Sequence, residues 1–366
     1  MTDVLIVCGG TGGHLAPGIA LAQEFNAQSY STKLYISKKA IDAEIVKKYK
    51  ELEFDSVSGK AFSNGILGRL QFILDLLFSI PKIILEIRSH KPKVIVLFGG
   101  FLSVGFGLIG FILNQRLVLH EANCRVGKAV RLLKHFASRI YLPDGVSLKK
   151  ISKGVVKHCG YPLRKEFVKR NQGEARSDLG LNSDGRVLVV IGGSQGAEVL
   201  NQWVMDHFDH LADLGISIYC VTGLKSGLSS EDTISLSGNR SVFVKMVPFS
   251  DDMVSVLSSA DLILSRAGAG SIAEITRCEV PSILIPYPYA ADDHQLMNAR
   301  MHEQAGAGIV VSQNRIDTLR GEVEDLIFND QVLEQLKINL AGLNKIDSSK
   351  LIVQDIMSDF FPKQKH

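Results

Sequence analysis

Short apolar runs alternate with helical stretches along most of the chain. Runs without polar alternation are typical of strands buried on both faces, and strands that alternate with helices build a parallel sheet covered on both sides. The pattern therefore predicts an α/β protein. The expected strands are Val4–Cys8, Lys33–Ile36, Val94–Phe98, Leu117–His120, Val187–Ile191, Ile216–Val221, Val242–Val244, Leu262–Leu264 and Ile283–Ile285.

One strand–glycine turn–helix unit occurs twice. Its turns begin at Gly9 and Gly192, and 192 minus 9 gives a spacing of 183 residues, half of the 366-residue chain. The first turn leads into a helical stretch at Leu15–Phe25, and the second leads into a helical stretch through Trp203. We therefore expect two Rossmann-like, doubly wound parallel-sheet domains, with their glycine turns facing a central cleft beyond the carboxyl ends of the strands.

The expected domains cover residues 1–160 and 161–346, with the linker near residues 160–164. The last segment, 347–366, contains a helix at about Lys350–Phe360. Its pattern alone leaves open which domain it contacts, and we expect it to pack back on the N-terminal domain.

An uncharged run from Val94 to Leu113 is long enough to cross a bilayer. Gly99-Gly100 interrupts it directly after a short β-branched stretch. This arrangement is typical of a buried strand and a tight turn into a buried helix. We therefore expect no transmembrane helix here.

Charge is distributed unevenly along the chain. Residues 1–164 carry 23 Lys and Arg against 11 Asp and Glu (+12), and the remainder carries 18 against 27 (−9), which gives the net charge of +3. A basic half indicates an anionic partner, either a membrane surface or a pyrophosphate-bearing substrate, although a merely solvated basic face remains an alternative. The basic residues form no recognisable nucleic-acid-binding module, so we expect no nucleic acid.

Composition and cysteine spacing fit an ordinary globular protein. Hydrophobic residues make up 46% and charged residues 22% of the chain, and its five cysteines form no C-x-x-C pair. This spacing argues against a zinc site or a disulfide framework and suits a reducing compartment. The N-terminus shows no basic leader before an apolar stretch, so we expect no signal peptide.

The glycine turn at residues 9–13 indicates a phosphate ligand, because a helix N-terminus offers backbone amides and the positive end of the helix dipole. The dinucleotide pattern G-x-G-x-x-G fails at Leu15. The second strand ends in Ser37-Lys38-Lys39, without an acidic residue for a ribose, and the chain has no Walker motif. A nucleotide or pyrophosphate is therefore expected, but neither NAD nor ATP hydrolysis.

A second candidate phosphate site follows the strand at Leu262–Leu264. The small residues Ala269, Gly270 and Ser271 would let a diphosphate approach a helix start, and Glu274 could accept hydrogen bonds from two ribose hydroxyls. The alternative is a capping box, in which Ser271 caps the helix and Glu274 returns a hydrogen bond.

Further polar residues lie where catalytic or sugar-binding groups are expected. His294 and Gln295 could bind sugar hydroxyls, and for the preceding Asp292-Asp293 pair we favour helix-start charges over a metal site. His14, just before the first helix, could act as a general base, or cap the helix or bind a phosphate. His120-Glu121 ends a strand at the carboxyl edge.

Together these motifs resemble the MurG family of glycosyltransferases over essentially the whole chain, in family order. Phe101 stands where the family usually has tyrosine, Ala122 replaces glutamine in H-E-Q-N, and Tyr161 replaces asparagine in G-N-P-V-R. The matching segments are Gly9–His14 with Pro17-Gly18, Gly99–Phe101, His120–Asn123, Gly160–Arg164, Gly192–Ala197, Arg266–Glu274, Asp293–Gln295 and Asn298-Ala299.

The resemblance implies a GT-B fold and an inverting transfer in peptidoglycan synthesis, without cofactor or metal. N-acetylglucosamine would move from UDP-N-acetylglucosamine to the 4-hydroxyl of undecaprenyl-diphosphate-linked N-acetylmuramoyl-pentapeptide (lipid I to lipid II). The protein would act peripherally at the cytoplasmic face of the bacterial inner membrane.

The resemblance also implies roles for individual residues. It makes His14 the catalytic base, with Glu121 as the rival. It also implies substrate binding by Thr11, Gly12 and Gly13, and by Asn123 and Arg164, which would border the same cleft. On the donor side it implies Ser194 and the amides of Ala269, Gly270 and Ser271 for the diphosphate, Glu274 for ribose, the Ser250 backbone for uracil, and Gln295 with His294 for the sugar.

Residues 66–87 form a strongly apolar stretch with few charges, among them Arg69 and Lys82. Such a helix can lie in a lipid headgroup layer, can pack on its own sheet, or can do both. We expect Pro81 to divide it into two pieces, and we expect Arg69 and Lys82 to contribute to binding of anionic lipid.

Three rival functions remain open at this point. A UDP-N-acetylglucosamine epimerase shares the two-domain architecture but needs no lipid acceptor. A glycolipid synthase would use a diacylglycerol acceptor on the same fold. A nucleotide-sensing scaffold at the membrane would have no activity.

Overall fold

The computed structural model describes residues 2–9, 12–38, 45–57, 66–152, 154–181, 185–193, 196–235, 241–344 and 346–361, with the backbone alone at 12, 66–70, 72 and 73. The chain forms two compact units, which are described separately below. Unit 1 comprises Met1–Lys165 and Ile346–His366, and unit 2 comprises Glu166–Lys345. The boundary therefore falls just after the segment 160–164, and the last helix belongs to unit 1.

Unit 1 contains a seven-stranded, wholly parallel sheet in the order β3-β2-β1-β4-β5-β6-β7. Alternate residues of β1 lie in different cores: Val4 and Ile6 contact one cluster, and Leu5 and Val7 contact the other. Helices therefore cover both faces, as expected. The strands are β1 Val4–Val7, β2 Thr32–Ser37, β3 Phe54–Val57, β4 Val94–Leu97, β5 Leu117–His120, β6 Arg139–Leu142 and β7 Val156–His158.

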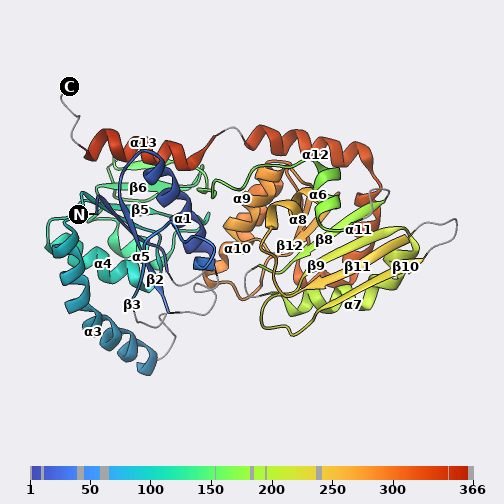
Figure 1. Cartoon of the computed structure of the whole chain (residues 1–366), viewed down its shortest axis with the longest axis horizontal. Helices are drawn as coiled ribbons and strands as arrows, with labels where there is room; N and C mark the ends of the chain where they lie inside the picture. The colour runs from blue at the N-terminus through green and yellow to red at the C-terminus, as the bar shows by residue number, and fades with distance from the viewer. Residues whose placement is uncertain are drawn as a thin grey trace. The chain divides into compact units, whose positions relative to one another are not determined.

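The two faces of this sheet carry different helices. Helices α1 and α13 pack together on one face, where Phe25 and Ile352 share a core (Figure 1). Helices α3 and α4 cover the other face. The helices of unit 1 are α1 Gly12–Ala27, α3 Ile66–His90, α4 Gly100–Ile112, α5 Lys128–Leu133 and α13 Ser348–Phe360.

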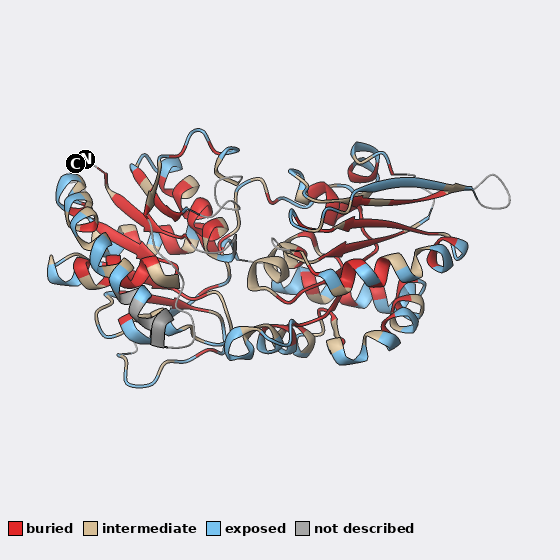
Figure 2. Ribbon diagram, turned by 90° about the horizontal axis from the view of Figure 1, so that it is seen from below, coloured by how far each residue is buried: buried red, intermediate tan, exposed pale blue. Residues whose placement is uncertain are grey.

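Unit 2 repeats the plan with the order β10-β11-β9-β8-β12-β13-β14. Its sheet is parallel except for the exposed edge strand β10, which is antiparallel to β11. Figure 2 shows buried strands between helices whose outer faces are exposed. The strands are β8 Arg186–Ile191, β9 Ile216–Val221, β10 Ser230–Ser235, β11 Ser241–Val247, β12 Leu262–Ser265, β13 Ser282–Leu284 and β14 Ile309–Val310. The helices are α6 Gln172–Asp178, α7 Glu198–Asp213, α8 Met253–Ser259, α9 Ala269–Cys278, η1 Ala291–Asp293, α10 His294–Gln304, η2 Gln313–Thr318, α11 Leu319–Ile327 and α12 Asp330–Leu343.

The uncharged run after Lys93 is a strand and a helix, as predicted. It forms the buried strand β4, the turn at Gly99-Gly100 and the largely buried helix α4. Within the described part of the chain, every helix is too short or too polar to cross a membrane.

Helix α3 corrects the prediction that Pro81 divides the apolar stretch. The helix runs without interruption from Ile66 to His90 with Pro81 inside it. Pro81 removes one helix hydrogen bond, but Ile83 and Ile87 after it are buried in the core and hold the helix in place.

Lys82 does not flank α3 as a free cation. Its ammonium lies 3.0 Å from Oδ1 of Asp55 and donates to the Ser56 carbonyl. The side chain of Arg69 lies outside the described residues.

Candidate functional site

The strand order of unit 1 reverses between β1 and β4, and such a reversal opens a crevice at the carboxyl ends of the strands. The chain leaves β1 at Gly9 and β4 at Gly99. A side chain at Gly9 would lie 2.2 Å from the Ser37 nitrogen, so only glycine fits. The first glycine turn and Gly99-Gly100 therefore meet at this crevice.

His14 is the third residue of α1, which begins at Gly12, so it lies inside the helix and not just before it. Its imidazole packs on the turn at Gly99-Gly100. A Cβ atom placed on either glycine would lie 3.4–3.5 Å from a ring nitrogen of His14. Both glycines have positive φ, 93° and 74°. The turn at Gly99-Gly100 thus supports the imidazole of the candidate base. Thr11 lies outside the described residues.

His120 lies close enough to His14 to affect it electrostatically. Complete burial lowers the pKa of His120 to about 4, and the charge of His14 adds to this shift, against a hydrogen bond with the Gly160 backbone. His120 is therefore neutral near pH 7 and adds no positive charge beside His14.

The carboxylate of Glu121 orders the loop that follows β5. Oε1 accepts from the backbone nitrogen of Asn123 (2.9 Å) and from its side-chain amide (3.1 Å), and Oε2 accepts from the Gly127 nitrogen (2.6 Å). With three hydrogen bonds to the loop, this carboxylate has a structural role. Asn123 is thereby fixed at the carboxyl edge of the sheet.

Arg164 is anchored within unit 1. Its guanidinium donates to the hydroxyl of Tyr49, 2.8 Å away, and Tyr49 is 3% exposed. The adjacent Lys165 nitrogen donates to the side chain of Gln23 in α1. The segment that leads to unit 2 is therefore attached to the helix that carries His14.

In unit 2 the strand order reverses between β8 and β12. Gly192 and Gly193 follow β8, and Gly192 has no room for a side chain because Ala197 nitrogen would lie 2.2 Å away. The motif around Arg266–Glu274 follows β12. Both predicted glycine motifs thus lie at the reversal point, while Ser194 falls outside the described residues.

Helix α9 is not started by a capping box. Its N-cap is Gly268, and no side chain of the described residues caps it, so Ser271 is the third helical residue. The capping alternative was therefore wrong. The amides of Ala269, Gly270 and Ser271 belong to the first turn, whose amides have no partner within the helix. Glu274 lies about one turn further on and is half-buried.

Arg266 connects two segments of the candidate site, a role that the sequence analysis did not predict. Its buried guanidinium donates to the Ile285 carbonyl (3.1 Å) and to Gln313 Oε1 (2.7 Å). Burial lowers the pKa of Arg266, since few charges offset its desolvation. The residue joins the start of α9 to the loop after β13, and only the spacing of the motif hinted at it.

The loop after β13 holds His294 and Gln295 in defined orientations. Gln295 Oε1 accepts from the Tyr287 nitrogen (3.0 Å), so its amide nitrogen is left for other partners. His294 Nδ1 lies 2.8 Å from the Ala291 carbonyl. Asp292 and Asp293 both have positive φ, and among the described residues no group of acidic, histidine and cysteine side chains could hold a metal ion.

Ser250 follows β11 at the same edge of the sheet. Its side chain is hydrogen-bonded to Tyr219, whose pKa is raised chiefly by burial. The hydroxyl is therefore occupied within the protein, which is compatible with the expected use of the Ser250 backbone.

Two doubly wound sheets, each with a glycine turn at the point where the strand order reverses, are typical of the class of nucleotide-sugar transferases, and similar proteins belong to this class. Residues 4–142 match the glycosyltransferase family 28 N-terminal domain, and residues 187–354 match its C-terminal domain. Two curated relatives are each named UDP-N-acetylglucosamine--N-acetylmuramyl-(pentapeptide) pyrophosphoryl-undecaprenol N-acetylglucosamine transferase. One, from Opitutus terrae, is 42% identical over 97% of this chain and 94% of its own. The other, from Prochlorococcus marinus, is 34% identical over 97% and 96%.

Solved structures share the fold. Acinetobacter baumannii MurG has a TM-score of 0.73 at 20% identity, covering 98% of this chain and 100% of its own. Anabaena HepE in complex with UDP and glucose has a TM-score of 0.64 at 14% identity, covering 98% and 100%. The fold is therefore of the GT-B type and the chain is a glycosyltransferase. It belongs to the MurG family of N-acetylglucosamine transferases.

Proposed function

We propose that this protein moves N-acetylglucosamine from UDP-N-acetylglucosamine to the 4-hydroxyl of undecaprenyl-diphosphate-linked N-acetylmuramoyl-pentapeptide. The observation that carries the proposal is the start of α9, where the amides of residues 269–271 lie at the reversal point of the sheet without a side-chain cap from the described residues. A helix start of this kind can bind a diphosphate, and the proposal assigns Glu274 to accept hydrogen bonds from a ribose.

On the donor side, the proposed contacts follow the chain along one sheet edge. Ser194 and the α9 amides bind the diphosphate, Glu274 binds the ribose, and the Ser250 backbone binds uracil. Gln295 donates from its amide nitrogen to a sugar hydroxyl oxygen, because its carbonyl oxygen is taken by Tyr287. His294 borders the same sugar.

On the acceptor side, His14 acts as base. It takes the proton of the 4-hydroxyl, whose oxygen attacks the anomeric carbon while the bond to the UDP oxygen breaks. The leaving diphosphate keeps the bonding electrons, and the amides of α9 stabilise its charge. One displacement converts an α-linked donor into a β-linked product. Residues 11–13, Asn123 and Arg164 border the acceptor.

The reaction is tested by product analysis with UDP-N-acetylglucosamine and a polyprenyl-diphosphate muramoyl-pentapeptide acceptor. We expect a β-linked disaccharide and UDP in equal amounts, and no change of the donor when the acceptor is left out. A change of the sugar without acceptor would instead indicate an epimerase. Transfer to diacylglycerol would indicate a glycolipid synthase, and UDP binding without turnover a nucleotide sensor.

Two substitutions separate the base from its rival. His14→Ala should lower kcat by about 100-fold or more, because general-base catalysis contributes about 10²–10⁴-fold, with UDP affinity by calorimetry retained. Glu121→Gln should cost less, about tenfold, and should lower the melting temperature because the loop loses a carboxylate acceptor. If Glu121→Gln were as inactive as His14→Ala at an unchanged melting temperature, Glu121 would be the base.

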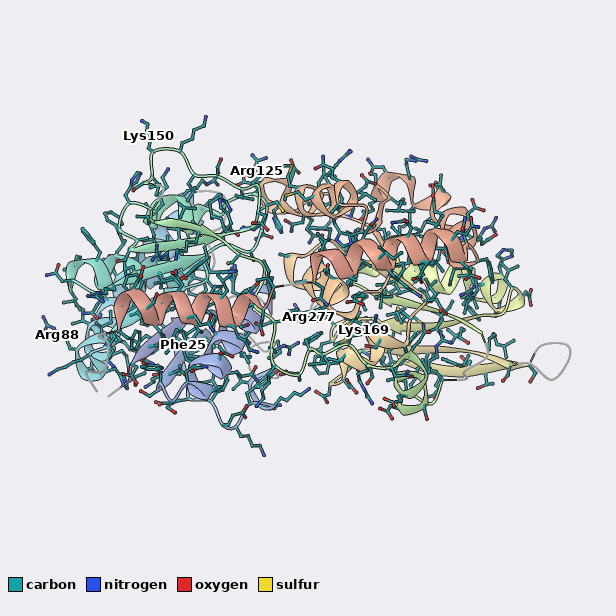
Figure 3. All side chains as sticks on the ribbon, turned by 90° about the horizontal axis from the view of Figure 1, so that it is seen from above. Phe25, Arg88, Arg125, Lys150, Lys169 and Arg277 are labelled. Atoms are coloured by element: carbon teal, nitrogen blue, oxygen red, sulfur yellow. The ribbon has the colours of Figure 1, made fainter. Side chains whose placement is uncertain are left out.

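We further propose that unit 1 binds an anionic membrane surface through α3, peripherally and at the cytoplasmic face of the bacterial inner membrane. Opposite the face packed on α4, this helix exposes four side chains: Leu74 (43%), Leu77 (54%), Phe78 (82%) and Leu85 (64%). A stripe this apolar is unusual on a soluble helix and suits a headgroup layer. Arg88, at the end of the same helix, points outward (Figure 3).

Co-sedimentation with vesicles of phosphatidylglycerol and phosphatidylethanolamine tests the membrane contact. Phe78→Asp with Leu85→Asp should weaken binding about tenfold or more, because two exposed apolar groups are lost and two negative charges face an anionic surface. Ile338→Asp in unit 2, where Ile338 is 56% exposed, is the matched control. Equal binding by all proteins would exclude this face.

A further inference from the structure

The first turn of α1 lacks one of its regular hydrogen bonds. In an α-helix the carbonyl of residue i accepts from the N–H of residue i+4. Four residues after Gly13 comes Pro17, which lies inside α1 and has no N–H. The Gly13 carbonyl therefore has no such donor. This carbonyl belongs to the same peptide group as the backbone nitrogen of His14.

Tyr161 supplies a donor to this carbonyl. Its hydroxyl donates to the Gly13 oxygen over 3.1 Å, from a residue 148 positions away in the sequence. The bond therefore reaches the peptide group of His14 from outside the helix. Tyr161 is also one of the positions at which the chain departs from the family pattern, where asparagine is usual.

The backbone around Tyr161 is fixed on both sides of the residue. Gly160 lies so close to α13 that a side chain there would come within 2.8 Å of Ser348 Oγ. The Leu163 carbonyl accepts from Ser349 Oγ (3.2 Å), and the Lys165 nitrogen donates to Gln23 in α1 (2.9 Å). The backbone that carries Tyr161 is therefore braced against α13 and α1.

The geometry points to Tyr161 as a positioning residue for His14: its hydroxyl replaces the helix hydrogen bond that Pro17 removes and fixes the peptide group of the base. The imidazole itself rests on Gly99-Gly100, so ring and backbone are held by different elements. This inference rests on the proposed role of His14 as base. The inferred role depends on the single hydroxyl of Tyr161, which Tyr161→Phe removes while the aromatic ring is retained.

Tyr161→Phe should lower kcat about fivefold to tenfold, the size expected for one hydrogen bond that acts on the orientation of the base. The KM for UDP-N-acetylglucosamine and the Kd for UDP should stay within twofold, since the proposed donor residues lie in unit 2. Tyr161→Asn, which offers an amide donor, should retain more of the rate than Tyr161→Phe.

The decisive variant combines Tyr161→Phe with Pro17→Ala. Alanine at position 17 restores an N–H that can donate to the Gly13 carbonyl, so the double variant should recover at least half of the lost rate. A structural defect elsewhere would not be repaired by this second change. Tyr141→Phe is the matched control, because it deletes a hydroxyl bonded to Asp355 (2.6 Å) in the same unit and should lower the melting temperature with wild-type kcat.

Three results would overturn the inference: wild-type kcat in Tyr161→Phe, failure of Pro17→Ala to restore it, or a loss of kcat in Tyr141→Phe equal to that in Tyr161→Phe. Failure of the proposed function looks different. In that case the unmodified protein makes no β-linked product, or His14→Ala remains active.

Discussion

Burial fixes the charge of two histidines. His120 in unit 1 and His302 in unit 2 are 1% and 5% exposed, and desolvation lowers the pKa of each to about 4. The unfolded chain has the ordinary histidine pKa of about 6.5 and binds the proton more readily. Each side chain therefore makes its full contribution to the free energy of unfolding only above about pH 6.5. This contribution is lost progressively as the pH drops from about 6.5 to about 4.

The pH dependence of the unfolding free energy of unit 2 should be governed by His302. At pH 5 the wild type should have lost about 2 kcal/mol of unfolding free energy relative to pH 7.5 through this residue, by linkage. His302→Gln, which cannot titrate, should show a flatter dependence, measured by urea unfolding with the fluorescence of Trp203, the only tryptophan. Gln335→Ala, which changes an exposed and uncharged side chain of unit 2, should keep the wild-type slope. Parallel slopes for His302→Gln and wild type would contradict the prediction.

At the scale of elements, the sequence predicted the strands that precede the glycine turns, because these strands are apolar throughout. It missed β3, β7 and β10, whose residues are mostly half-buried or exposed and carry no continuous apolar pattern, and it missed the two-residue strand β14. It also missed β6, which begins with Arg139. The charge of Arg139 is balanced by Asp355 of α13, more than 200 residues later, and no local pattern reveals such a pair.

The candidate site was predictable to a similar extent. Motif spacing located the residues at the strand ends, but not the hydrogen bonds among them. The loop-ordering role of Glu121 and the brace formed by Arg266 depend on contacts between separate segments. The start of α1 was placed too late because glycines 12 and 13 have low helix propensity, although the helix includes them.

Pro81 is the element-scale feature that is open to a direct test. It removes one hydrogen bond within the continuous helix α3, and it is exposed. Pro81→Ala should restore an N–H for the Leu77 carbonyl and raise the unfolding free energy of unit 1 by about 1–3 kcal/mol. Thermal unfolding followed by far-UV circular dichroism measures the change, with Ser89→Ala in the same helix as a control expected to differ by less than about 0.5 kcal/mol. A lower stability of Pro81→Ala would show that α3 depends on its proline.

At the scale of the whole molecule, the chain returns to its first unit at the end. Helix α13 follows unit 2 in sequence but packs on α1. Asp355 secures it: the carboxylate lies 3.0 Å from Arg139 Nε, accepts from Tyr141, and pairs with Lys157. Burial opposes ionisation, but the hydrogen bonds from Lys157 and Tyr141 outweigh it, so the pKa of Asp355 lies below its usual range.

Because α13 packs on unit 1, the stabilities of the two units can be tested separately. Asp355→Ala removes the buried carboxylate that pairs with Arg139 and leaves it the half-exposed Asp359. Breaking a buried pair costs about 3–5 kcal/mol, and the remaining pair places the expected loss at the lower end of this range. Because Asp355 stabilises unit 1 and Trp203 lies in the core of unit 2, circular dichroism should gain an early transition while the fluorescence midpoint stays unchanged. Asp261→Ala, which breaks the buried pair with Arg176 in unit 2, should do the reverse and move the fluorescence transition. If Asp355→Ala shifted both signals together, the two units would unfold as one, and the final helix would stabilise the whole chain instead of its first half.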